Sequence, residues 1–239
     1  MPRKRKVPGL NLLQPLRFAV PEAWTQLPVL DHWTSYDKDP ALIAWARGQA
    51  RAMLGADATA EQVAGRAATL TALTYAARRQ GVHYSLVFFT QDPYDLLGTL
   101  NVRQVIAGRK GQRLSPGTVR QEFGQPPGDL PGELQDVEVE ETRAELRSGP
   151  ALRIVRRETR RDGQTGRVWH PETVVWTVWP PDVGDAVVMV FLWSFNYSPD
   201  FRDQLARLAE EVADSVVMGP AAAATPITPP AGLPPASGQ

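Results

Sequence analysis

The sequence of 239 residues contains no cysteine. This absence excludes disulfide bonds, thiolate zinc sites, cysteine nucleophiles and a lipid-modified N-terminal cysteine. Histidine is also scarce, and the three histidines, His32, His83 and His170, are too far apart in sequence to form a short-spaced metal-binding pair. We therefore expect neither a metal site nor a cofactor.

The chain also lacks an excess of charge of either sign and any long apolar run. Lys and Arg number 26, as do Asp and Glu, so the formal net charge is +0 and gives no general attraction to nucleic acid or to acidic membranes. No segment approaches the roughly 18–20 apolar residues of a membrane helix. Pro8, Gly9 and Pro15 interrupt the place where a signal peptide would have its apolar core. These features predict a soluble, cytoplasmic protein that does not bind membranes.

Both ends of the chain differ in composition from the middle. The start carries the basic run Arg3-Lys4-Arg5-Lys6, and residues 219–239 are rich in Pro, Ala, Thr and Gly, with no apolar face that could pack. We predict a flexible basic N-terminus over 1–14, a single domain over 15–218 and a disordered Pro/Ala-rich tail over 219–239.

Three helices are predicted from their N-terminal signals. Asp39-Pro40 places a capping residue before a proline at the first helical position, and Thr59 with Gln62 forms a capping-box pattern. Ser198-Pro199-Asp200 begins a third helix, which Gly219-Pro220 should end. Apolar residues at three- and four-residue spacing continue each of them.

Strand-like segments make up most of the remaining chain. They lie at 16–20, 82–89, 100–106, 134–146, 152–160, 168–179 and 186–193. The apolar run of 186–193 is typical of a central strand, whereas 27–38 is predicted to be a loop and 108–132 a long excursion with little regular structure. This order predicts an α+β fold in which helices cover an antiparallel sheet.

Charge is arranged in blocks along the second half of the chain. Residues 103–120 and 147–161 are mainly basic, and 129–145 are mainly acidic. The short turn at 148–150 predicts that the acidic strand pairs antiparallel with the second basic strand. Val137 and Val139 would then share a core face with Leu152 and Ile154, while the acids Asp136, Glu138 and Glu140 face Arg153 and Arg157. Because this pairing neutralises the surface, we expect no tight binding to nucleic acid.

No pattern of catalytic residues is present. The sequence has no nucleophile elbow, and Gly108-Arg109-Lys110-Gly111 is basic and glycine-rich but lacks the spacing of a phosphate-binding loop. The seven tryptophans favour an aromatic core. Exposed aromatic residues in a polar loop indicate binding, and the residues with a candidate binding role are Trp33, Tyr36, His83, Asp92, Tyr94, Arg109 and Lys110.

The segment Phe18-Ala19-Val20-Pro21-Glu22-Ala23-Trp24 resembles the opening strand of the Mog1/PsbP-like proteins. The last predicted strand and the helix that ends at Glu211-Val212-Ala213-Asp214-Ser215-Val216 also resemble the end of that family. The resemblance covers the two ends of the chain and the order of elements. It implies an α/β/α sandwich that acts by binding proteins, and it brings no shared catalytic motif.

Two hypotheses about function follow. The first is a non-enzymatic cytoplasmic binding module that acts through a protein partner, with the oligomeric state left open. The second is an enzyme or small-molecule binder whose aromatic-lined cleft lies between the sheet and the helices of 40–80, with His83, Asp92 and Tyr94 as its polar groups.

Overall fold

The protein is described here by a computed structural model, which describes residues 16–20, 24–29, 39–89, 96–105, 115–123, 130–181, 185–195 and 199–218. A seven-stranded sheet has the strand order β2-β3-β4-β8-β7-β6-β5, every neighbouring pair is antiparallel, and β1 pairs with β9 in a separate two-stranded sheet. The elements are β1 Leu16–Arg17, β2 Thr25–Leu27, α1 Pro40–Leu54, α2 Ala60–Arg79, β3 Tyr84–Phe89, β4 Leu96–Val105, α3 Pro116–Phe123, β5 Glu133–Leu146, β6 Gly149–Arg161, β7 Val168–Val178, β8 Ala186–Phe195, α4 Pro199–Asp214 and β9 Val217–Met218.

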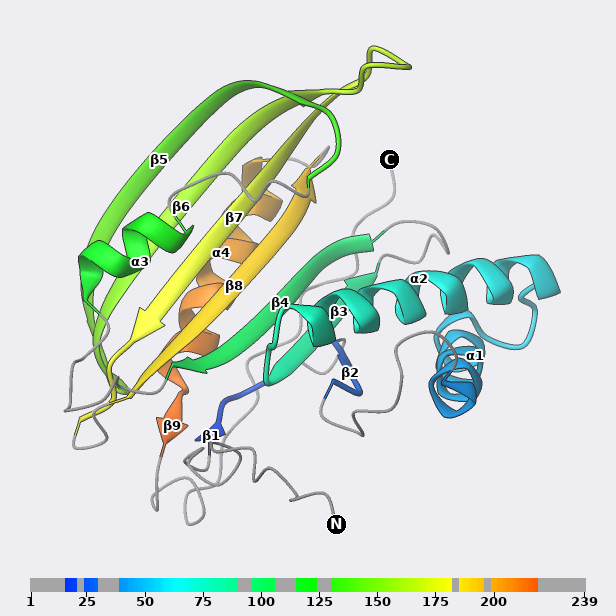
Figure 1. Cartoon of the computed structure of the whole chain (residues 1–239), viewed down its shortest axis with the longest axis horizontal. Helices are drawn as coiled ribbons and strands as arrows, with labels where there is room; N and C mark the ends of the chain where they lie inside the picture. Colours follow the sequence, from blue (N-terminus) through cyan, green and yellow to red (C-terminus); the bar gives the residue numbers. More distant parts are fainter. Residues whose placement is uncertain are drawn as a thin grey trace, which may run out of the picture.

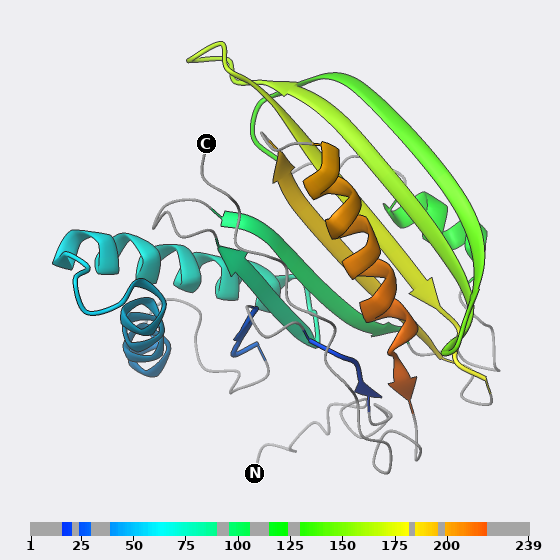
Figure 2. The ribbon, with the colours of Figure 1, turned by 180° about the vertical axis from the view of Figure 1, so that it is seen from behind.

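Helices lie on both faces of the large sheet. In Figure 1 the helices α2 and α3 lie in front of it and α1 lies to its right, next to α2, and Figure 2 shows α4 crossing the opposite face. Three buried clusters correspond to these layers: α4 packs on Trp176 and Phe191, α2 packs on Val87, and α3 places Val119 against Leu152. The predicted α+β fold, an antiparallel sheet covered by helices, is confirmed.

The helix starts lie where the capping signals predicted them. The Asp39 carboxylate accepts the N–H groups of Ala41 and Leu42 at 3.1 and 3.2 Å. Thr59 and Gln62 form both bonds of the capping box, at 3.2 and 2.8 Å. α4 begins at Pro199 as predicted, but it ends at Asp214, before the predicted Gly219-Pro220. The predicted first strand over 16–20 contains only two paired residues.

Three short elements were not predicted. β2 lies at the edge of the predicted loop 27–38, α3 lies within the predicted excursion 108–132, and β9 lies in the predicted last turn of the final helix. β2 and β9 exist because a distant strand pairs with them, and α3 buries Val119 against β6. The predicted flexible N-terminus and the predicted tail lie outside the described residues.

Candidate functional site

The outer strand β5 is the most exposed regular element of the described chain. It pairs with β6 along its whole length, and no other strand of the described residues pairs with it. Figure 1 shows β5 at the outer edge of the sheet. Every residue from 135 to 143 is exposed. We call the strand Glu133–Leu146 the acidic edge, because six of its charged residues are acidic and only Arg143 is basic: Glu133, Asp136, Glu138, Glu140, Glu141 and Glu145.

One face of the acidic edge carries two exposed valines. Val137 and Val139 have exposed fractions of 42% and 49%, and their strand partners are Glu158 and Arg156. They share a face with Leu152 and Ile154 as predicted, but their predicted place in the core is wrong. The core on this face is formed where α3 covers β6, and it does not extend to the two valines.

The other face carries the acidic side chains. Arg157 of β6 lies 3.5 Å from a carboxylate oxygen of Glu138 and 3.3 Å from one of Glu140. The predicted contact with Arg157 is therefore confirmed. Arg153 lies instead opposite Thr142, and no ion pair with an acid of β5 is described for it.

Arg157 also connects the acidic edge to the interior. It donates to Glu172 of β7 at 3.0 Å, and Arg202 of α4 donates to the same carboxylate oxygen at 2.9 Å. The pKa of Glu172 is raised by burial, although Arg157 and Arg153 act in the opposite direction. Glu172 therefore holds both arginines in place. Of the two, Arg157 also contacts the carboxylates of the acidic edge.

A buried ionic cluster lies beside the valines. Glu158 accepts from Arg156 through one oxygen and from Arg160 through the other, each at 2.5 Å, and all three residues are buried. Arg160 also donates to the carbonyl oxygens of Leu130 and Gly132 at 2.8 and 2.9 Å. Because each charge has a partner, this cluster fixes the β6 side chains next to the exposed valines.

The helix α3 is attached to the acidic edge by a bidentate contact. Arg120 donates to both oxygens of Glu141 at 2.8 Å, and this contact lowers the pKa of the Glu141 carboxyl below its usual value. α3 is thereby fixed over β6 while the valines stay uncovered.

Most of the residues predicted as a binding site cannot be placed. Trp33, Tyr36, Asp92, Tyr94, Arg109 and Lys110 lie outside the described residues. His83 is half-buried, and its Nδ1 accepts the backbone N–H of Gln104 at 2.9 Å. Burial, helped by the charge of Arg103, lowers the pKa of His83. The ring thus holds β4 in place. The alternating pattern of 134–146 predicted a strand of the sheet but gave no reason to expect it at an edge.

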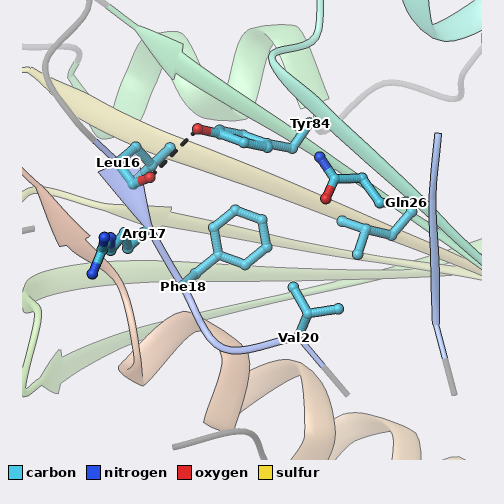
Figure 3. Close-up of a pocket in the computed structure, with 7 residues that line it drawn as sticks. Leu16, Arg17, Phe18, Val20, Gln26 and Tyr84 are labelled. Carbon is cyan, nitrogen blue, oxygen red and sulfur yellow. Dashed lines mark hydrogen bonds between the residues drawn. The ribbon is translucent and has the colours of Figure 1, made fainter. Parts of the chain in front are cut away.

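A pocket of about 380 Å³ lies over β3 and is formed by the N-terminal segment and β2. Phe18 and Tyr84 meet edge to face with ring centroids 5.4 Å apart, and the Tyr84 hydroxyl donates to the Leu16 carbonyl at 3.4 Å. Figure 3 shows the Arg17 guanidinium pointing away from the Phe18 ring. The lining side chains Tyr84 and Leu86 face away from α1 and α2, so this pocket is not the cleft that the second hypothesis expected.

The described residues lack two further features. They contain no group of three or more His, Asp or Glu side chains that could hold a metal ion. No helix among them is both long enough and apolar enough to cross a membrane.

No protein-family model matches the sequence, and no curated protein matches it significantly. The chain is similar to a solved structure described as LpqN involved in cell envelope biogenesis of Mycobacterium tuberculosis. The identity is 13%, the TM-score is 0.40, and the match covers 86% of this chain and 83% of that one. Membership in the Mog1/PsbP-like family stays a prediction.

Proposed function

We propose that the protein is a non-enzymatic cytoplasmic binding module that docks a protein partner on the acidic edge. The supporting observation is a 14-residue strand at the end of the sheet, exposed along its middle and paired, among the described residues, on one side only. An edge strand presents a row of backbone N–H and C=O groups that another chain can pair with. Addition of a partner strand to such an edge is a recurring mode of peptide recognition.

The exposed valines indicate that the edge is suited to binding a partner and is not merely accessible to one. Four large apolar residues of the described chain are markedly exposed, and two of them, Val137 and Val139, are neighbours on the same face of β5. An added strand would lie beside β5, on the side away from β6, and would place its own side chains next to both valines. Backbone pairing would supply affinity, and these side chains would supply part of the specificity.

The proposal is tested by affinity isolation of the full chain from its native cell, followed by hydrogen exchange on the recovered complex. The variant Val137→Lys/Val139→Lys places two lysines on the edge, a device that blocks strand addition. The control is Ile43→Lys, which changes an apolar residue of α1 with an exposed fraction of 41%. Wild type and control should recover a stoichiometric partner that protects residues 135–143, and the double variant should lose it. Equal recovery by the double variant, or no stoichiometric partner at all, would contradict the proposal.

A further inference from the structure

The acidic edge also indicates the chemistry of its partner. We infer that the partner supplies an extended segment in which apolar and basic residues alternate. This inference rests on the proposed function and adds the identity of the side chains that face β5. It follows from the strand geometry, from the charge of the edge and from the like-charge contacts that disfavour a second copy of the chain.

Strand geometry sets the alternation. Successive side chains of a strand point to opposite faces, and residues directly opposite each other in an antiparallel pair are about 5 Å apart. On β5, Val137 and Val139 point to the face of α3, and Glu138 and Glu140 point to the face of α4. A partner strand therefore places every second residue beside the valines and the residues between them beside the carboxylates.

The charge of the edge determines which charge the partner's side chains should carry. Arg157 is the basic side chain described in contact with Glu138 and Glu140, and it also serves Glu172. The side chains of Glu138 and Glu140 remain 70% and 47% exposed. Arg157 and Arg202 together meet three carboxylates, Glu138, Glu140 and Glu172. This leaves a net negative charge on the face, which complements lysine or arginine in the partner.

A second copy of this chain is disfavoured at the edge when the two β5 strands pair about Val139, the centre of the exposed segment. Two β5 strands paired antiparallel about Val139 would place Glu138 opposite Glu140 and Glu133 opposite Glu145, as their positions along the strand require. Like charges directly opposite each other destabilise a strand pair. In this register the edge disfavours self-association, while its charge attracts a basic strand.

β6 gives an example of the same chemistry within the chain. Its segment 152–157 is composed of aliphatic and arginine side chains, and Arg157 lies opposite Glu138. The inner side of β5 is therefore already paired with a basic and apolar strand. The outer side presents the same side chains to a partner.

The test uses the full chain and a synthetic peptide of about eight residues, a usual strand length, in which valine and arginine alternate. One comparison peptide replaces arginine with glutamate, and another has the same composition with all arginines in one block. Binding is measured by fluorescence anisotropy at low and high salt, and the binding site is located by hydrogen exchange.

The protein variant that tests the charge of the edge is Glu138→Gln/Glu140→Gln. The control is Glu61→Gln/Glu211→Gln, which removes the same charge from exposed positions of α2 and α4.

The alternating peptide should bind, protect residues 135–143 and bind more weakly at high salt. The Glu138→Gln/Glu140→Gln variant should weaken it about fivefold, and the control should not. Both comparison peptides should bind more weakly than the alternating peptide. Binding of the glutamate peptide with equal affinity, or protection of residues 135–143 by a self-associated form of the chain, would overturn the inferred chemistry.

The two proposals fail in different ways. If a native partner without a basic strand protects 135–143, the inferred chemistry is wrong and the binding function stands. If no peptide protects 135–143 and the lysine variant leaves partner recovery unchanged, both are wrong.

Discussion

The two edges of the seven-stranded sheet are built differently. β2 has three residues, and its last residue, Leu27, is 1% exposed and packs with α1 and α2. β5 has 14 residues, and its middle is exposed. Short or covered edge strands are how proteins usually prevent unwanted pairing. The β2 edge is short and ends in a buried residue, whereas the β5 edge, within the described part of the chain, has no further strand paired with it and carries mainly acidic side chains.

The two edges therefore have different roles: the β2 edge contributes to stability, and the β5 edge is proposed to bind a partner. Residues at the β2 edge contribute apolar burial, so replacing them should destabilise the fold. The outer residues of β5 contribute little burial, and their stability comes from β6 and from the ionic cluster next to it. The open edge can therefore vary in sequence without loss of the fold. The following predictions test this contrast, from the largest expected effect to the smallest.

The largest effect is expected from Glu158→Ala, because it leaves Arg156 and Arg160 in the interior without this carboxylate. Breaking a buried ionic contact by removing one partner costs about 3–5 kcal/mol. Urea denaturation should show a loss of this size in the free energy of unfolding. The control Glu138→Ala removes an exposed carboxylate from the same hairpin and should cost about 1 kcal/mol or less. A similar loss in the two variants would show that the buried cluster does not support the edge.

The contrast between the edges is measured directly by Leu27→Ala and Val139→Ala. Leu27 is fully enclosed, so its truncation leaves a cavity and should cost about 2–5 kcal/mol. Val139 is half exposed, and its truncation should change the free energy of unfolding by no more than about 0.5 kcal/mol. Both losses in the free energy of unfolding are calculated from the midpoints of urea denaturation, with the slope of the transition unchanged between the variants. Comparable losses would mean that the two edges are equally buried in solution.

The smallest effect is a difference in pH dependence between two carboxyls. Burial raises the pKa of Glu172 above its usual value of 4.5, so the folded state binds this proton more tightly than the unfolded state does. Relative to Glu172→Gln, the wild-type free energy of unfolding should fall as pH rises from 4.5 through the raised pKa.

Glu141 should show the opposite sign. Arg120 lowers its pKa, so its contribution is present above 4.5 and is lost as pH falls through the lowered value. Thermal unfolding of both Gln variants against wild type between acidic and neutral pH measures both slopes. The same sign for both carboxyls would contradict the assigned environments.

The sequence predicted best what is decided locally. The starts of α1, α2 and α4 depend on a capping residue and a proline or glutamine within three positions, and all three were located correctly. β2 and β9 depend instead on partners far away in the chain, and nothing in their own two or three residues distinguishes them from a loop or a helix end.

At the candidate site, too, the sequence predicted the features that are determined locally and missed those that depend on distant parts of the chain. Alternation correctly predicted which face Val137 and Val139 occupy and that Arg157 meets Glu138 and Glu140. Their exposure could not be predicted, because it depends on where α3 lies and on β5 being the last strand of the sheet. The order of strands within a sheet is not encoded in the alternation of any one of them.

The pairing of β1 with β9 has a mechanical consequence. Leu16, at the start of β1, pairs with Met218, at the end of β9. A force applied through the segments outside these residues would open this pair like a zipper, one contact after the other, and would not shear the two strands past each other. The small sheet would therefore yield before the load reached the seven-stranded sheet.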